Sequence, residues 1–302
     1  MNNPIIISVG GGKGGVGKST ITANIGTSLC KRGFTVGYID ADLGGANLHL
    51  CLGIPRPGTG LQDFVQGRYR DLSQIAVPLH DTRSWLISGA SDILELANPN
   101  FAQKQKLIRN LSKMSADYIL VDLGAGSDYH VTDFYAAYPH GIIVTDGLPT
   151  SIENAYGFLK NGILRGLTRL FPGEILLQNS IKKFINPKNG KPFATMGELF
   201  DGLKDEYPAA VDRMRTWLQQ RRTFLILNMI KDADDVKVGV RFTEMVKKYL
   251  YINIYYIGYI VYSADIRKSI KAMRPLVEYN PGSKSAECYA SVTQNLIALT
   301  RG

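Results

Sequence analysis

The stretch that decides the fold is Gly10-Gly11-Gly12-Lys13-Gly14-Gly15-Val16-Gly17-Lys18-Ser19-Thr20, which follows an apolar run at residues 5–9. Residues 12–19 fit the phosphate-binding loop G-x-x-x-x-G-K-[ST], whose glycines let backbone N–H groups point at an anion. A turn that binds nothing needs one or two glycines, whereas residues 10–17 contain six. The stretch therefore predicts a site for the phosphates of a nucleotide.

Each part of this loop has an expected role. Lys18 is expected to lie on the β- and γ-phosphates, and Ser19 to offer its hydroxyl to Mg²⁺. A helix predicted over residues 19–32 adds the positive end of its dipole, and Gly33 supplies its C-terminal stop. The residues expected to hold the nucleotide here are Gly12, Gly14, Gly15, Val16, Gly17, Lys18, Ser19 and Thr20.

Length and composition are those of a soluble globular protein. The 302 residues are 45% hydrophobic and 20% charged, which suffices for a sizeable core. No basic segment precedes the first apolar run, so no signal peptide is expected and we predict a cytoplasmic protein. The most apolar stretch, residues 249–262, is shorter than the ~20 residues needed to cross a bilayer and is predicted to be a buried strand.

Cysteine and histidine give no sign of a metal centre. The three cysteines are far apart and lack C-x-x-C spacing, which argues against zinc, an iron–sulfur cluster and a disulfide scaffold. The four histidines are equally scattered. The net charge of +9 raises the affinity for polyanions, but it does not identify which polyanion.

Strand-like and helical patterns alternate along the chain. Such alternation predicts an α/β fold, in which a mainly parallel sheet is covered by helices on both faces and ligands bind at the carboxyl ends of the strands. The strand-like runs are residues 5–9, 35–39, 85–88, 118–123, 141–145, 224–228 and 254–261.

Residues 171–222 break this rhythm. Turn signals at residues 186–192 precede two predicted helices, at residues 195–206 and 208–222. We therefore expect a single P-loop ATPase domain over residues 1–302 with a helical insertion at residues 171–222. Residues 151–222 contain twelve Lys or Arg and seven Asp or Glu, so this quarter of the chain carries five of its nine excess positive charges.

Carboxylates follow two of the predicted strands. Asp40 and Asp42 follow the second run, and Asp122 follows residues 118–121, with which it has the form of a Walker B strand. One carboxylate of the first pair can hold the water shell of Mg²⁺ while the other orients an attacking water, and Asp122 can complete the metal site opposite Ser19. The alternative for the first pair is a solvated acidic turn or helix cap.

Together these residues resemble a known superfamily. Residues 13–19 are similar to the deviant Walker A motif of the MinD/ParA superfamily. Residues 40–42, 122–126 and 149–156 look like its MinD and FlhG branch. The resemblance covers the chain except the insertion, and it implies an ATPase that dimerises face to face around two ATP molecules.

The resemblance also implies residue roles. Lys13 would cross to the phosphates of the partner subunit, and Asp42 would be catalytic, alongside Lys18. Asp40 would be an outer residue of the magnesium site. Asn228 matches the position that reads adenine, although an Asn at a strand end is also a common cap.

Two departures from the family pattern affect these expectations. The last predicted helix, residues 283–300, has little basic flank, so we expect it to dock on the core rather than on a membrane as the last helix of MinD does. The loop at residues 262–265 lacks the proline usual in the family's adenine loop.

The sequence is compatible with three functions. The first is an ATP-switched dimer that regulates positioning or assembly, such as the division site or flagellum number, with slow hydrolysis stimulated by a protein partner. The alternative is a ParA-like partition ATPase that binds DNA non-specifically in its ATP state, suggested by the basic residues at 265–274. The third, a kinase or transferase, lacks a second-substrate motif.

Overall fold

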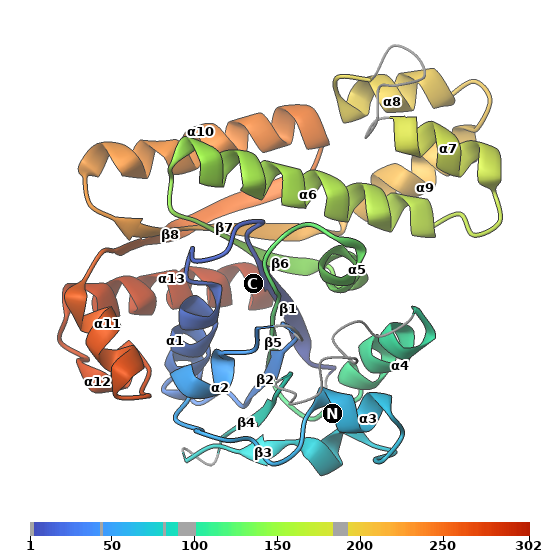
Figure 1. Cartoon of the computed structure of the whole chain (residues 1–302). Coiled ribbons are helices and arrows are strands. Elements are labelled where there is room, and N and C mark those ends of the chain that lie inside the picture. The colour runs from blue at the N-terminus through green and yellow to red at the C-terminus, as the bar shows by residue number, and fades with distance from the viewer. Residues whose placement is uncertain (1–2, 43–44, 81–82, 90–100, 184–192) are drawn as a thin grey trace.

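The computed structural model describes residues 3–42, 45–80, 83–89, 101–183 and 193–302. In this part of the chain, strands form one eight-stranded sheet in the order β3-β4-β2-β5-β1-β6-β7-β8, parallel throughout except for the β3–β4 pair (Figure 1). The strands are β1 (Ile5–Gly10), β2 (Val36–Asp40), β3 (Val77–Pro78), β4 (Ser84–Ile87), β5 (Tyr118–Asp122), β6 (His140–Thr145), β7 (Arg222–Ile230) and β8 (Asn253–Val261).

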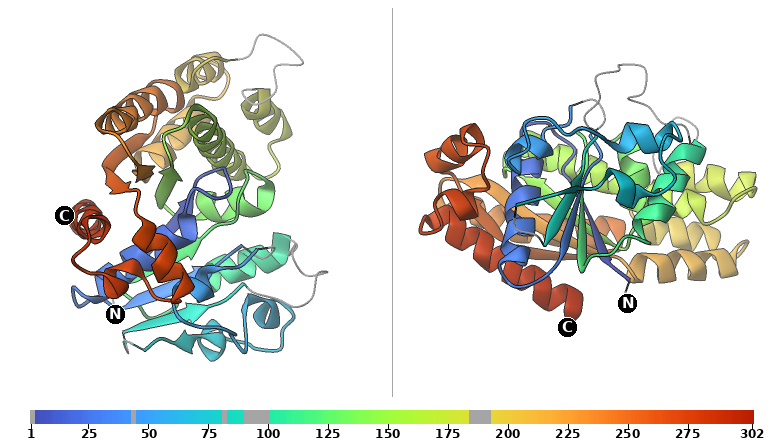
Figure 2. Two further views of the ribbon diagram at one scale, coloured as in Figure 1. Left: turned by 60° about the vertical axis from the view of Figure 1, so that its left-hand side comes forward. Right: turned by 90° about the horizontal axis from the view of Figure 1, so that it is seen from below.

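Helices cover both faces of this sheet (Figure 2). One face carries α1 (Lys18–Cys30), α2 (Leu48–Cys51), α11 (Ala264–Lys271), α12 (Leu276–Tyr279) and α13 (Lys284–Arg301). The other carries α3 (Leu61–Val65), α4 (Phe101–Leu111), α5 (Tyr129–Ala137), α6 (Pro149–Arg169), α7 (Ile175–Lys183), α8 (Met196–Leu203), α9 (Pro208–Gln219) and α10 (Ala233–Leu250), together with the short 3-10 helix Leu72–Ile75.

The strand pattern explains why two cores form. Successive side chains of a strand point to opposite faces, so Ile6 joins the cluster under α5 and α6 while Ile7 joins the cluster under α1 and α13. The central strands β1, β2 and β5 are covered on both faces and therefore consist almost wholly of buried residues. The predicted α/β fold is confirmed.

Two sequence predictions were wrong in detail. Residues 249–262 are not one buried strand, because α10 continues to Leu250 and β8 is the edge strand of the sheet, with only Ile257 and Ile260 buried within it. Within residues 171–222, the described part holds three helices rather than two, since α7 was missed. The turns predicted at residues 186–192 lie outside the described residues.

The segment α7–α9 packs onto the body of the protein. Leu177, Phe200 and Leu218 from its three helices belong to the same buried cluster as Leu164 of α6 and Val246 of α10. We therefore propose that the chain forms one domain. In the described part of the chain, none of the helices combines the length and the apolar character needed to cross a membrane.

Candidate functional site

The candidate site forms where the carboxyl ends of the central strands meet. The parallel register pairs Asp122 of β5 with both Val9 of β1 and Asp40 of β2. Two carboxylates that are 82 positions apart in the sequence therefore lie on neighbouring strands, beside the loop that follows β1. This is the edge of the sheet at which α/β proteins bind ligands.

The loop between β1 and α1 has the backbone that a phosphate cradle needs. Gly12, Gly15 and Gly17 have φ angles of 71°, 80° and 91°, which L side chains rarely adopt. A side chain at Gly17 would also collide with Asn228, because a Cβ there would lie 2.3 Å from Nδ2. Helix α1 begins directly after this glycine, at Lys18, and so its N-terminal N–H groups face the loop.

The two lysines of the loop point to different places. Lys18 is buried and lines the cavity described below, and its Nζ donates to the carbonyl oxygen of Lys13 at 3.4 Å. Burial lowers the pKa of Lys18, against the opposing charges of Asp122 and Asp42. Lys13 instead donates to the hydroxyls of Thr150 (3.4 Å) and Ser151 (3.2 Å) at the start of α6.

Asp122 lies against the first residues of α1. It accepts hydrogen bonds from the hydroxyls of Ser19 and Thr22, the latter at 3.3 Å. Burial raises the pKa of Asp122, and these hydroxyls together with the charge of Lys18 oppose the rise. Thr22 was not predicted as a site residue from the sequence. Its position one helical turn after Lys18 is the feature that could have indicated it.

The side chains of Asp40 and Asp42 have different surroundings. The two oxygens of the buried Asp40 accept the backbone N–H groups of Asp42 (3.2 Å) and Leu48 (3.1 Å), so Asp40 holds the segment after β2 in place. Burial raises the pKa of Asp40 well above its usual range, and the nearby Asp122 adds to this. Asp42 faces the cavity and approaches the loop after β5, since a Cβ at Gly124 would lie 3.2 Å from its Oδ1.

A cavity of about 750 Å³ opens beside the loop. The predicted residues Gly14, Gly15, Gly17, Lys18, Ser19, Thr20, Asp42 and Asn228 line it, while Gly12, Lys13, Val16, Asp40 and Asp122 do not. Sequence reasoning missed several further lining residues, which come from α2 and from β7 through α11. They are Leu50, Cys51, Met229, Ile266, Arg267, Ile270 and Lys271. The loop at residues 262–265, singled out from the sequence, does reach the cavity through Tyr262 and Ser263.

Asn228 connects this cavity to the phosphate loop. Strand β7 continues to Ile230 instead of ending at Asn228 as predicted, and the register shifts between Leu227 and Ile230. The amide Nδ2 of Asn228 donates to the carbonyl oxygen of Val16 at 2.8 Å, whereas its buried Oδ1 has no hydrogen-bond partner among the described residues. An unsatisfied acceptor at a cavity wall fits an amino group on a ligand.

The described residues hold no ready-made metal site of three or more His, Cys, Asp or Glu side chains. The oxygens near the loop are the Ser19 hydroxyl and the Asp122 carboxylate, which lie side by side. Mg²⁺ is usually held by one or two such protein oxygens, with phosphates and water completing its shell. These two residues therefore fit a nucleotide-bound Mg²⁺.

A parallel sheet whose first strand runs into a glycine-rich phosphate loop and a helix defines a P-loop nucleotide-binding protein. Residues 7–277 match the CobQ/CobB/MinD/ParA nucleotide binding domain family, to which the chain therefore belongs. It is a nucleotide-binding ATPase domain of the MinD/ParA type, as its loop motif predicted.

Several curated proteins are similar in sequence. The antiactivator FleN of Pseudomonas aeruginosa is 25% identical over 294 residues, which cover 96% of this chain and 85% of FleN. The flagellum site-determining protein YlxH of Helicobacter pylori is 36% identical over 205 residues, 67% of this chain but 65% of YlxH, which is less than two thirds of its length. The septum site-determining protein MinD of Thermotoga maritima is 32% identical over 200 residues, 60% of this chain and 71% of MinD.

Solved structures confirm the fold. The cell division ATPase MinD of Pyrococcus furiosus has a TM-score of 0.66 at 20% identity, covering 98% of this chain and 99% of that one. MinD of Pyrococcus horikoshii, solved with Mg-ADP, has a TM-score of 0.65 at 21% identity, covering 97% and 96%. A ParA family ATPase from Chlorobium tepidum scores 0.64 at 18% identity, covering 96% and 98%.

Proposed function

We propose that the protein is an ATP-hydrolysing molecular switch that forms a dimer around two ATP molecules. One observation carries the proposal. Lys18 lines the nucleotide cavity of its own chain, whereas Lys13, five residues earlier in the same loop, is not among the described residues that line it. A second loop lysine outside its own cavity supports the proposal that Lys13 serves the cavity of a partner subunit.

The residues of one chain supply most of the chemistry. The loop N–H groups and Lys18 bind the phosphates of ATP, and Asn228 accepts a hydrogen bond from the adenine amino group through its Oδ1. Ser19 and Asp122, supported by Asp40, would hold Mg²⁺, which would neutralise negative charge on the phosphates of the nucleotide. Asp42 orients the attacking water, since its carboxylate faces the cavity beside Lys18.

Lys13 makes hydrolysis conditional on dimerisation. In the isolated chain its ammonium group is held by two hydroxyl contacts of 3.2 and 3.4 Å, which are long for charge-assisted hydrogen bonds and are easily exchanged for a phosphate. A cation that arrives from a partner stabilises the charge of the transition state as an arginine finger does. Hydrolysis then sets the lifetime of the dimer, with slow turnover stimulated by a protein partner.

The cellular role we favour is regulation of positioning or assembly. FleN is named as an antiactivator, YlxH as a flagellum site-determining protein and MinD as a septum site-determining protein, and these names support a role of this kind. The second candidate is DNA binding of the ParA type, because α11 carries Arg267, Lys268 and Lys271 on the surface of the molecule or at the cavity mouth. DNA binding that requires ATP and weakens steeply with salt would favour that candidate.

The switch is tested by sedimentation of the Asp42→Ala chain. This variant is expected to bind ATP without hydrolysing it, and therefore to accumulate as a dimer with ATP but not with ADP. Lys18→Ala, which removes the phosphate contact, is the matched control and is expected to stay monomeric with either nucleotide. A monomeric Asp42→Ala chain at saturating ATP would contradict the proposal.

Asn228 gives a separate prediction about nucleotide choice. The Asn228→Ala variant is expected to lose about tenfold in ATP affinity, because one hydrogen bond of about 1–1.5 kcal/mol to the base is removed. The contact with Val16 is lost as well, which weakens any nucleotide, so the ratio of ATP to GTP affinity is the decisive quantity. We expect this ratio to fall when it is measured by displacement of a fluorescent nucleotide. An unchanged ratio would show that Asn228 only supports the phosphate loop and does not contact the base.

A further inference from the structure

A second cavity, of about 520 Å³, lies between α4, α6 and the α7–α9 segment. Its walls include Gln105 of α4, Ala137 of α5, Gln178 of α7 and Trp217 of α9. Along α6 it lies fourteen residues from Ser151, which contacts the phosphate loop, a separation of about 20 Å at 1.5 Å per residue. It is therefore distinct from the nucleotide cavity.

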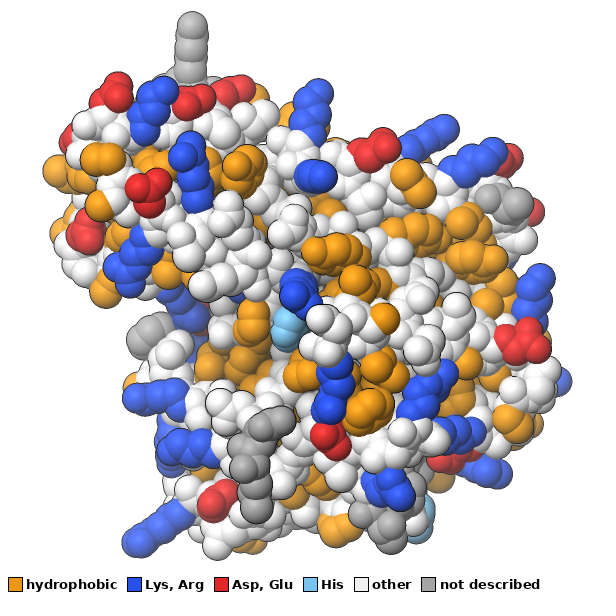
Figure 3. Space-filling model, turned by 180° about the vertical axis from the view of Figure 1, so that it is seen from behind, with side chains coloured by type: hydrophobic (Ala, Val, Ile, Leu, Met, Phe, Trp, Pro, Cys, Tyr) orange, Lys and Arg blue, Asp and Glu red, His pale blue; other side chains and the backbone are white. Residues whose placement is uncertain are grey.

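The second cavity is strongly basic. Arg165, Arg169 and Lys182 line it, and no Asp or Glu is among the described lining residues. Figure 3 shows Lys and Arg side chains along the hollow below the α7–α9 segment, at the left of that view. Such a surplus of positive charge in a concave surface concentrates anions.

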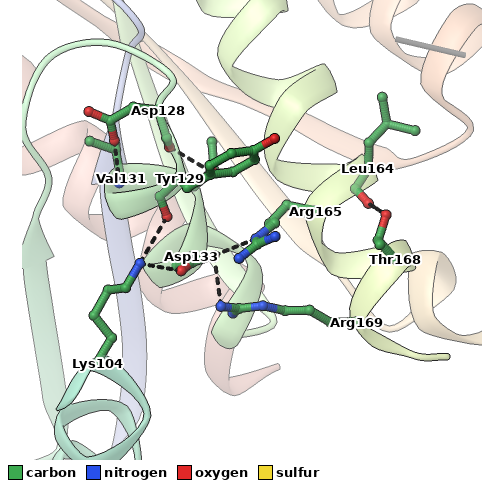
Figure 4. A network of polar contacts seen from close by, with 10 residues as sticks. Lys104, Asp128, Tyr129, Val131, Asp133, Leu164, Arg165, Thr168 and Arg169 are labelled. Atoms are coloured by element: carbon green, nitrogen blue, oxygen red, sulfur yellow. Dashed lines mark hydrogen bonds and ion pairs between the residues drawn. The ribbon is translucent and has the colours of Figure 1, made fainter. Parts of the chain in front are cut away.

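A buried carboxylate holds the two arginines in place. Asp133 of α5 is fully buried and forms ion pairs with Arg165 Nε at 2.6 Å, Arg169 Nη2 at 2.7 Å and Lys104 Nζ at 2.5 Å (Figure 4). One negative charge faces three positive ones, so the cluster keeps a net charge of about +2. Burial alone would raise the pKa of Asp133, but hydrogen bonds from Arg165 and Lys104 and the charge of Arg169 hold it below its usual range.

This arrangement prepares the guanidinium groups for a ligand. Arg165 lies 4.7 Å from the ring of Tyr129, and so it is held by both an ion pair and an aromatic face. Side chains fixed in this way lose little conformational entropy on binding. The planar fork of arginine matches the oxygens of phosphate, and the exposed Lys182, which also lines the cavity, adds a third charge.

We propose that this cavity binds a small organic phosphate carrying two or more negative charges, at a site separate from the nucleotide site. The volume is that of a small-molecule pocket, and the three cations converge on it from α6 and α7. The ligand would connect α6, whose first turn contacts Lys13, to the α7–α9 segment. The proposal does not depend on ATP hydrolysis or dimerisation.

The test uses the tryptophan of the cavity as a reporter. The chain has two tryptophans, and Trp85 packs against Gly37 of β2, outside the second cavity. In a Trp85→Phe chain, fluorescence therefore comes from Trp217 alone. Inorganic pyrophosphate is the probe, titrated with Mg-ADP present to fill the nucleotide site, and calorimetry of the chain without the Trp85 substitution repeats the measurement.

We expect a saturable response that Lys182→Gln weakens about tenfold and that Arg165→Gln weakens at least as much. Arg165→Gln leaves Asp133 paired with Lys104 and Arg169, so the fold is retained. The matched control is Lys204→Gln, an exposed lysine of the same segment that lies outside the cavity. No saturable response, equal binding by the Lys182→Gln and control chains, or binding of an oligoglutamate peptide that pyrophosphate does not displace would overturn the proposal.

Discussion

Replacement of Lys13 with alanine is expected to reduce ATP hydrolysis by about 10³-fold or more, while ATP still binds. The reason is geometric. The loop glycines, Lys18 and Ser19 line the cavity without Lys13, so binding to one chain does not need the missing ammonium group. In the proposed dimer, by contrast, Lys13 of the partner subunit stabilises the charge of the transition state, so hydrolysis needs it.

Phosphate release and nucleotide binding measured on the same samples separate these effects. Lys18→Ala is expected to lose both binding and hydrolysis, because Lys18 lines the proposed nucleotide cavity of its own chain. Lys204→Ala, an exposed lysine paired only with Asp201 among the described ion pairs, is expected to change neither. Normal hydrolysis by the Lys13→Ala chain, or a loss of binding equal to that of Lys18→Ala, would be inconsistent with a role in the partner's site.

The Asp133→Asn chain is expected to be about 3–5 kcal/mol less stable than the unmodified chain. Asp133 is fully buried and is the shared partner of three cations, one of which, Lys104, is itself buried. An amide in its place leaves the buried Lys104 and the partly exposed Arg165 and Arg169 without their counter-charge. Urea unfolding measures the difference, and Asp201→Asn, which removes an exposed pair, is expected to cost less than about 1 kcal/mol.

Asp133 also predicts how stability depends on pH. Its folded pKa is depressed, so its contribution is fully present above the unfolded value of about 3.9 and is lost as pH falls through the folded pKa. The unmodified chain should therefore lose more stability than the Asp133→Asn chain when pH is lowered below about 4. Parallel acid-unfolding curves for the two chains would show that Asp133 is not the group responsible.

The nucleotide site could be predicted because local patterns specify it. Glycines that permit positive φ are visible in the sequence, and a parallel sheet brings the ends of β1, β2 and β5 to one edge whatever the loops between them do. Asp40 and Asp122 were therefore expected together, and the register pairs them. The place of Lys13 against α6 depends on tertiary packing and could not be foreseen.

No local sequence pattern predicted the second cavity. Asp133 meets Lys104 and Arg165 across separations of 29 and 32 residues, with no motif linking them. Arg221 likewise makes contacts that no motif predicts. It is buried over the ring of Trp217 and donates to the carbonyl oxygen of Tyr135 in α5, 86 residues away in the sequence. In the same way, β8 looked fully buried because its composition is apolar, whereas its place at the sheet edge depends on the order of the strands.

Mixing two inactive chains tests the central claim most directly. Lys13→Ala keeps Asp42, and Asp42→Ala keeps Lys13, so neither variant alone should hydrolyse ATP. If Lys13 acts across the dimer, one site of each mixed dimer contains both groups, and an equimolar mixture should recover about one quarter of the unmodified activity per chain. If Lys13 serves its own chain, no site in the mixture is complete, and the absence of any recovered hydrolysis would contradict the proposed switch.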